Sequence, residues 1–298
     1  MSSWEISIIE SLRSVATSFL DNLFKVITVL GEKEVLIVFI IGIYFMYSKK
    51  VGQRIAYSIF SSLHLNNIVK GIVARPRPWT HASANYQPVR PETATGFSFP
   101  SGHTQNSAVL YSSFAIETNK KPMFILAGIL IILIGFSRVF LGVHFPSDVV
   151  VGIILGVGCA VVGAIIHKRC EQTFKTQYIL YLITFALFLP FVFIFWKKDY
   201  NTNLLYRDFY TAIAFFGGYI IAVGLENRFV NFIDEASLLI RVIRTLIAIL
   251  LVVGILFGLK AILPKENILF DMLRYFLIPI IGIGLFPILG KGKLFKTK

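Results

Sequence analysis

Long apolar runs separated by short polar segments dominate the chain from residue 34 onward. A membrane-spanning helix needs about 20 mostly apolar residues, and most of these runs approach or reach that length. The pattern therefore predicts an all-α fold, a polytopic transmembrane helix bundle. The runs are residues 34–48, 52–73, 102–118, 123–142, 147–167, 177–196, 208–224, 243–262 and 272–290.

The first 31 residues follow a different pattern, because charged residues such as Glu5, Arg13 and Asp21 interrupt their apolar positions. Charged and apolar faces on one helix are typical of segments that lie in the membrane interface. We therefore expect one or two amphipathic helices in residues 1–31. A first membrane span within residues 16–31 is the alternative. The cleavage pattern of a secretory signal peptide is not expected here.

Two of the apolar runs, residues 52–73 and 102–118, carry polar side chains in their interiors. Polar groups in lipid are costly unless they face the bundle interior or a water-filled site. We expect these two helices to face each other or a cavity. In a third run, the four-residue spacing of Gly152 and Gly156 predicts close contact with a neighbouring helix.

Composition and charge support a membrane protein. The chain is 56% hydrophobic and 15% charged, with a mean hydropathy of +0.74. A soluble domain has about 45–50% apolar and about 25% charged residues. The net charge of +13 would suggest nucleic-acid binding in a soluble protein. Here we expect the bilayer as partner and no nucleic acid, because cytoplasmic loops accumulate Lys and Arg.

The basic residues also predict an orientation in a cell membrane. If the spans alternate in direction, all basic clusters lie on one side, and the positive-inside rule makes that side cytoplasmic. Residues 74–101 and 142–147 then lie on the extracytoplasmic side, whereas the C-terminus is cytoplasmic. The clusters lie in residues 49–54, 120–121, 168–175, 228–244 and 291–298.

Three polar clusters lie where runs meet the extracytoplasmic side. They bring two histidines, an aspartate and three strong cations to one membrane depth. Packed cations repel one another unless an anion lies between them, and helix N-termini with Lys or Arg bind phosphate-like groups. The clusters therefore predict an oxyanion site. They are Lys70 with Arg77 and Pro78, Pro100-Ser101-Gly102-His103, and Ser137-Arg138 with His144 and Asp148.

The same residues can do chemistry as well as binding. His144 and Asp148 are four residues apart, a spacing that puts both on one helical face. A carboxylate beside an imidazole orients the ring and stabilises its cationic form. His103, from another helix, can protonate a leaving alkoxide. One imidazole can thus attack phosphorus while the cations stabilise its oxygens. The acidic residues and histidines are too sparse for a dedicated metal site.

These clusters resemble the three signatures of the type 2 phosphatidic acid phosphatase superfamily, K-x6-R-P, P-S-G-H and S-R-x5-H-x3-D. Every signature residue is present, and the resemblance covers a core of about six helices in residues 16–168. It implies an integral membrane phosphatase that needs no metal and no cofactor. It also implies a phosphohistidine on His144, with His103 as general acid and Asp148 as the residue that orients His144. The implied phosphate ligands are Lys70, Arg77, Ser101, Gly102 and Arg138.

The expected substrate is a lipid phosphate or diphosphate, with isoprenyl diphosphate, phosphatidate and phosphatidylglycerophosphate as the candidates. A lipid or sugar phosphotransferase with the same phosphohistidine is the alternative. A third possibility is a vanadate-binding oxidase, which would use the same oxyanion site, but the hydrophobic composition argues against it. A fourth is a lipid transporter, which would not need the His144–Asp148 pair. Residues 169–298 add about four spans to which the family pattern gives no role. Arg75 and Arg90 are either surface charges or headgroup contacts.

Overall fold

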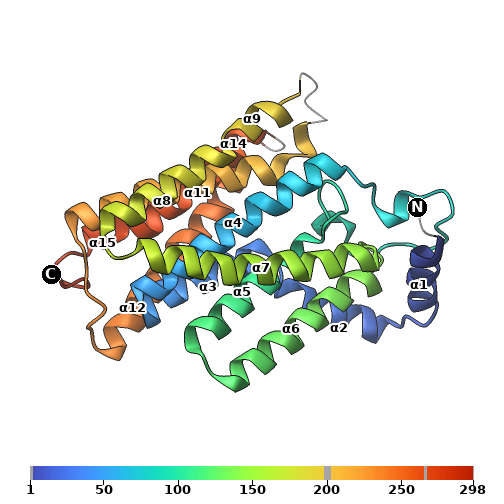
Figure 1. Ribbon diagram of the computed structural model, residues 1–298, viewed down its shortest axis with the longest axis horizontal. Coiled ribbons are helices and arrows are strands. Elements are labelled where there is room, and N and C mark those ends of the chain that lie inside the picture. Colours follow the sequence, from blue (N-terminus) through green and yellow to red (C-terminus); the bar gives the residue numbers. More distant parts are fainter. Residues whose placement is uncertain (1–2, 198–202, 265–266, 298) are drawn as a thin grey trace. The chain divides into compact units, whose positions relative to one another are not determined.

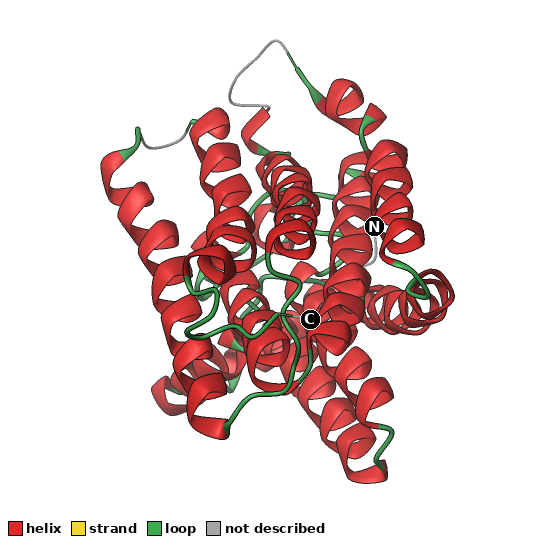
Figure 2. Cartoon of the chain, turned by 90° about the vertical axis from the view of Figure 1, so that its left-hand side faces the viewer, coloured by secondary structure: helices red, strands yellow, loops and turns green. Residues whose placement is uncertain are grey.

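The computed structural model describes residues 3–197, 203–264 and 267–297. Throughout these residues the chain consists of helices joined by loops, and no strand occurs among them (Figure 2). The predicted all-α class is confirmed. The chain forms two compact units, one of Met1–Leu36 with Ser61–Ala164 and the other of Ile37–Phe60 with Ile165–Lys298.

The first unit contains the three polar clusters. In it, α5 packs against α6, and α6 also contacts α1 and α2 (Figure 1). Two short 3₁₀ turns, η2 and η3, interrupt the loop between α4 and α5. The helices of this unit, some only in part, are α1 (Ser3–Ser14), α2 (Ser18–Val29), α3 (Lys33–Gly42), α4 (Lys49–Val73), η2 (Pro78–Thr80), η3 (Pro91–Thr93), α5 (Gly102–Thr118), α6 (Lys121–Phe140) and α7 (Pro146–Cys170).

The N-terminal segment forms two short helices rather than one long one. At 1.5 Å per residue, the 12 residues of α2 extend about 18 Å, which is too short for a hydrocarbon core of about 30 Å. An ion pair of 2.6 Å between Arg13 and Asp21 joins α1 to α2. Phe19 and Val26 on α2 are exposed, and exposed apolar side chains on a short helix are typical of helices that lie in the membrane interface.

A polar seam joins α4 to α5. The Asn66 side chain donates a hydrogen bond of 2.8 Å to Gln105 Oε1, and Gln105 Nε2 donates to Ser62 Oγ at 3.0 Å. All three side chains are buried. The two polar runs therefore face each other, as predicted, and the seam satisfies groups that would be costly in lipid.

The glycines of α7 allow the predicted close helix contact with α5, which is confirmed. A Cβ atom on Gly152 would lie 3.0 Å from the carbonyl oxygen of Ser101. On Gly156 it would lie 2.6 Å from the Gln105 carbonyl oxygen and 2.5 Å from the Ala108 Cβ. Since α5 begins at the Ser-Gly-His cluster and α7 carries Asp148, this contact fixes the distance between two parts of the candidate site.

The second unit is built around α11, which packs against α8, α14 and η5. A buried ion pair between Lys49 and Glu226, 2.5 Å long, lies in this unit. The unit contains parts of α3, α4 and α7 together with η1 (Ile43–Tyr47), α8 (Phe174–Phe188), α9 (Pro190–Phe195), α11 (Arg207–Phe229), α12 (Leu238–Val253), η4 (Gly254–Gly258), α13 (Leu259–Ile262), α14 (Ile268–Pro279), η5 (Ile280–Leu285) and α15 (Phe286–Leu289).

Six helical segments in the described residues are long and apolar enough to cross a membrane. The chain is thus a multi-pass membrane protein. The other three apolar runs correspond to α3 with η1, which is short, α4, which is rich in polar residues, and α5, which has 17 residues. The six segments are Lys121–Phe140, Pro146–Cys170, Phe174–Phe195, Arg207–Phe229, Leu238–Ile262 and Ile268–Leu289.

The glycine contact between α5 and α7 can be tested by adding one methyl group. We expect Gly156→Ala to lower the free energy of unfolding by about 1–3 kcal/mol, because overpacking displaces helix backbone. Gly158→Ala is the matched control, since its Cβ would meet nothing within 4 Å. Thermal unfolding of the detergent-purified variants measures both effects. Equal midpoints for the two variants would contradict the role of Gly156.

Candidate active site

The start of α5 lies against the start of α7. The Ser101 main-chain N–H donates a hydrogen bond of 3.0 Å to the carbonyl oxygen of Asp148. The Ser101 hydroxyl accepts one from Thr104 at 2.9 Å. The first helical bond of α5 runs from Gln105 N to the Ser101 carbonyl. The N–H groups of Gly102, His103 and Thr104 precede that bond, as is usual at a helix N-terminus.

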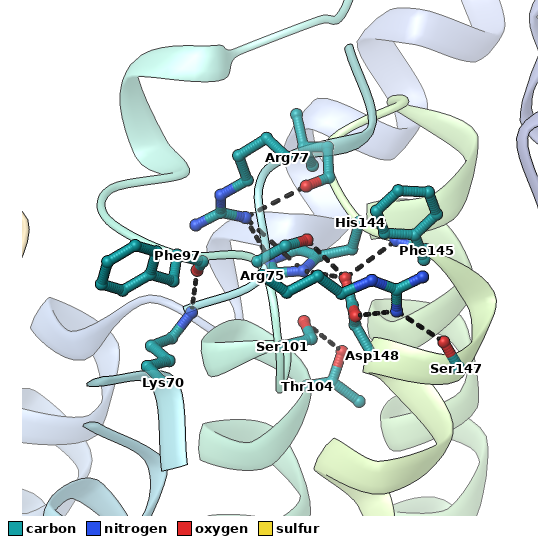
Figure 3. A network of polar contacts seen from close by, with 12 residues as sticks. Lys70, Arg75, Arg77, Phe97, Ser101, Thr104, His144, Phe145, Ser147 and Asp148 are labelled. Carbon is teal, nitrogen blue, oxygen red and sulfur yellow. Dashed lines mark hydrogen bonds and ion pairs between the residues drawn. The ribbon is translucent and has the colours of Figure 1, made fainter. Parts of the chain in front are cut away.

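Lys70 and Arg77 are held by carbonyl oxygens of the loop that leads into α5, and Figure 3 shows the contact between Lys70 and Phe97. Lys70, near the end of α4, donates to the carbonyl of Phe97 at 2.5 Å. Arg77 donates to the carbonyls of Thr95 and Gly96 at 2.6 and 3.1 Å. Both cations thus bind main-chain carbonyls of the loop before α5. A Cβ atom on Gly102 would lie 4.0 Å from Lys70 Cε, so this cation reaches the helix start.

Contacts on both sides determine the tautomer of His144. Arg77 Nη1 lies 2.8 Å from His144 Nε2, and His144 Nδ1 lies 3.2 Å from Asp148 Oδ2. A guanidinium only donates hydrogen bonds, so Nε2 accepts and is unprotonated. The ring proton is therefore on Nδ1 and is donated to the carboxylate. His144 presents the Nε2 lone pair to the cationic side of the site.

The neutral form of His144 is favoured by its surroundings. Burial, together with the positive charges of Arg77, Lys70 and Arg138, lowers the pKa of the imidazole well below its usual value of 6.5. A base with a lowered pKa keeps its lone pair at neutral pH. The ring is therefore in its neutral form at neutral pH.

Asp148 is fully buried and accepts four hydrogen bonds. Besides His144, its Oδ2 accepts the Phe145 N–H at 3.0 Å and the Ser98 hydroxyl at 2.5 Å. Its Oδ1 accepts Arg75 Nη1 at 2.8 Å. A carboxylate with both oxygens occupied has a fixed plane, so Asp148 fixes the orientation of the His144 ring.

Arg138 and His103 each keep one buried nitrogen without a hydrogen-bond partner among the described residues. These nitrogens are Nε of Arg138 and Nε2 of His103. The Arg138 Nη1 group donates to Thr28 at 2.8 Å, and Thr93 lies 3.4 Å away. The charge of Arg138 lies close enough to act on the His103 ring. Unsatisfied buried donors are costly unless a ligand supplies acceptors, and a phosphate oxygen is such an acceptor.

Three residues of this arrangement were not found from the sequence. Arg75 is paired with carboxylates and is not a plain surface charge. Ser98, in the loop before α5, donates to Asp148. Thr28, on α2, accepts from Arg138. Thr and Ser occur at many positions, and only the fold shows which of them meet the site. Arg90 forms an ion pair of 2.9 Å with Glu32.

Comparison with known proteins decides the family. The profile of the PAP2 superfamily matches residues 53–172. Phosphatidylglycerophosphatase B from Bacillus subtilis (strain 168) is 34% identical over 151 residues, covering 46% of this chain and 70% of that protein. The chain belongs to the PAP2 superfamily. A second profile, described as the transmembrane extension of PAP2 superfamily phosphatases, matches residues 210–294.

Further relatives of this PAP2 chain are also named phosphatases. Undecaprenyl-diphosphatase from Sulfolobus acidocaldarius is 32% identical over 44% of this chain and 65% of its own length. Lipid A 1-phosphatase from Rhizobium johnstonii is 29% identical over 44% of this chain and 53% of its own length. A transmembrane PAP2-type phosphatidylglycerolphosphate phosphatase from Bacillus subtilis has a crystal structure with a TM-score of 0.48 at 27% identity, covering 57% of this chain and 87% of that one. Because its named sequence relatives are phosphatases, the PAP2 chain is an enzyme of the phosphatase class.

The lowered pKa of His144 predicts its titration. In the free protein we expect the ring to gain a proton only well below pH 6.5, because protonation adds a charge to a buried site that already holds cations. Nuclear magnetic resonance of histidine-labelled protein measures the midpoint, and His144→Gln identifies the signal. A midpoint at or above 6.5 would contradict this electrostatic account.

Proposed function

We propose that this PAP2 enzyme hydrolyses a lipid phosphate or diphosphate through a phosphohistidine on His144, without a metal ion. The observation that supports it most is the pair of contacts on that ring. Asp148 receives the Nδ1 proton, while the Nε2 lone pair lies 2.8 Å from Arg77. A neutral imidazole with a fixed tautomer beside a cation is prepared to attack an anionic phosphoryl group.

In the proposed first step, His144 Nε2 forms a bond to phosphorus as the bond from phosphorus to the leaving oxygen breaks. The leaving oxygen belongs to the lipid alcohol in a monophosphate and to the inner phosphate in a diphosphate. The leaving oxygen takes a proton from His103, the general acid. Asp148 stabilises the positive charge that develops on the His144 ring. Water then attacks phosphorus with His103 as base, and the bond to Nε2 breaks. The products are inorganic phosphate and the lipid alcohol from a monophosphate, or inorganic phosphate and the lipid monophosphate from a diphosphate.

The phosphoryl oxygens are stabilised by fixed positive charges and helix N–H groups. We assign this role to Lys70, Arg77 and Arg138, with Ser101 and Gly102 at the start of α5. Because the Ser101 N–H is already donated to Asp148, Ser101 contributes through its hydroxyl. Such preorganised donors usually account for much of the rate enhancement of phosphoryl transfer.

A lipid substrate is supported by the membrane character of the chain and by the names of its relatives. Those relatives include a phosphatidylglycerophosphatase and an undecaprenyl-diphosphatase. Isoprenyl diphosphate, phosphatidate and phosphatidylglycerophosphate are therefore the candidates. The lipid tail would approach sideways between helices, and the phosphate would lie at the extracytoplasmic face. We further propose that residues 16–168 are the phosphatase core and that residues 169–298 are added membrane helices with a cytoplasmic C-terminus.

The decisive experiment is a phosphate-release panel on purified protein in the presence of EDTA. We expect release from at least one of the three lipid candidates, little from a soluble sugar phosphate, and background rates for His144→Ala. EDTA should not reduce the rate, since Lys and Arg take the role of a metal, and no metal-binding group of three acidic, His or Cys residues occurs in the described residues. Full activity of His144→Ala, or a strict magnesium requirement, would refute the mechanism. Transfer of phosphate to an added alcohol in preference to water would favour a phosphotransferase.

The general acid can be tested separately through the leaving group. We expect His103→Ala to slow hydrolysis of a lipid alkyl phosphate by about 10²–10⁴-fold, because a poor leaving group needs protonation. An aryl phosphate with a good leaving group should lose much less. Rates on both substrates, measured with the same preparation, give the comparison. Equal losses would show that His103 has another role.

A further inference from the structure

The amphipathic helix α1 contributes a buried carboxylate to the site. Glu5 is 3% exposed, and its Oε2 accepts Arg75 Nη2 at 2.7 Å. Its Oε1 accepts both the N–H and the hydroxyl of Ser147, at 3.0 and 2.6 Å. A buried carboxylate is stable only when paired and hydrogen-bonded, and Glu5 meets both conditions at the first turn of α7.

Arg75 lies between this carboxylate and that of Asp148, since it forms an ion pair with each. Figure 3 shows its contact with Asp148. Its Nη1 donates to Asp148 Oδ1 and to Ser147 Oγ, both at 2.8 Å. The guanidinium also stacks on the Phe145 ring, 3.7 Å from its centre. These contacts come from both ends and one face of the guanidinium, so Arg75 has a single well-defined position.

We propose that Glu5 and Arg75 are a positioning pair that holds Asp148, and through it His144, in the catalytic geometry. This inference rests on the proposed function, in which Asp148 orients the nucleophile. Glu5 lies outside residues 53–172, the part of the chain matched by the PAP2 profile. The positioning carboxylate therefore comes from the N-terminal helix rather than from the matched region.

The charges explain why two carboxylates are needed for one arginine. A lone arginine beside Asp148 would neutralise that carboxylate and compete with His144 for it. With Glu5 on its other side, Arg75 is shared, and the Glu5–Arg75–Asp148 group keeps one net negative charge. That charge remains available to stabilise the cationic His144 ring during phosphoryl transfer. Arg75 thus fixes the position of Asp148, while Glu5 prevents Arg75 from neutralising the negative charge of Asp148.

The test compares Glu5→Gln and Arg75→Gln with the wild type and with Glu10→Gln. Glu10 is the matched control because it lies on the same helix and accepts the Asn85 N–H at 2.8 Å, away from the Arg75 contacts. We expect kcat to fall about 10-fold to 100-fold in both variants, since small misplacements of catalytic groups have such effects. KM and inhibition by orthovanadate should stay within about twofold, because neither residue is proposed to bind phosphate. Glu10→Gln should keep the wild-type kcat.

The titration of His144 is the second readout, because it reports the charges of Glu5 and Arg75 at the ring rather than the stability of the fold. Glu5→Gln removes a negative charge and should lower the midpoint, whereas Arg75→Gln removes a positive charge and should raise it. The double variant should lose little more kcat than Arg75→Gln alone, because Glu5 acts mainly through Arg75. The charged or titratable groups around His144 are Lys70, Arg75, Arg77, His103, Arg138, Asp148 and, beyond Arg75, Glu5.

Two outcomes would overturn the inference. One is a Glu5→Gln enzyme with wild-type kcat. The other is a His144 midpoint that stays in place, or moves the same way, in both variants. If instead the wild type releases phosphate from none of the lipids, the proposed function fails, and the titration still decides whether Glu5 and Arg75 control the charge at His144. A loss of stability alone, with kcat per folded molecule unchanged, would also contradict a positioning role.

Discussion

The site depends on how each buried cation is satisfied. Lys70 and Arg77 donate to main-chain carbonyls of the loop before α5, and Arg138 donates to threonine hydroxyls. Carbonyl and hydroxyl dipoles satisfy N–H donors but do not by themselves cancel the charge of a cation. Arg75 is paired with two carboxylates. In the proposed function, the first three cations bind phosphate, whereas Arg75 organises the protein.

Helix packing provides the rigidity that this arrangement requires. The Asn66–Gln105 seam fixes α4 against α5, and the glycines of α7 bring α5 within backbone contact. Each of these helices carries one polar cluster at or next to its end. A hydrogen bond from Ser101 to the Asp148 carbonyl then joins two clusters directly. The contacts that pack these helices against one another therefore also set the positions of the polar clusters at the helix ends.

Much of this could be predicted from local sequence patterns. Apolar runs predicted the helices, polar positions such as Asn66 and Gln105 predicted which helices face each other, and the glycine spacing of α7 predicted a close contact. These signals work because helical period and burial are local properties. The clusters also lie together in the first unit, as the alternation of spans implied, while their roles remain proposals.

The partners that hold the clusters could not be predicted in the same way. Arg75 and Arg77 are two residues apart in a loop with no periodic pattern, yet one points to Asp148 Oδ1 and the other to His144 Nε2. Only the path of the loop backbone makes these two side chains point to different partners. Glu5 and Arg75 are 70 residues apart in the chain. In the sequence, Glu5 looks like one of the ordinary charged residues on the polar face of an amphipathic helix. Long-range pairs of this kind leave no signature in a single sequence.

The contact between Arg77 and His144 has a consequence for selectivity. As long as the guanidinium donates to Nε2, the lone pair of the ring is occupied and cannot react with other electrophiles. An incoming group frees that lone pair only by offering Arg77 a better acceptor, which a doubly charged oxyanion does and a neutral ester does not. Under the proposed mechanism, recognition and activation are thus one event, and the free enzyme is shielded by the residue that would receive its substrate.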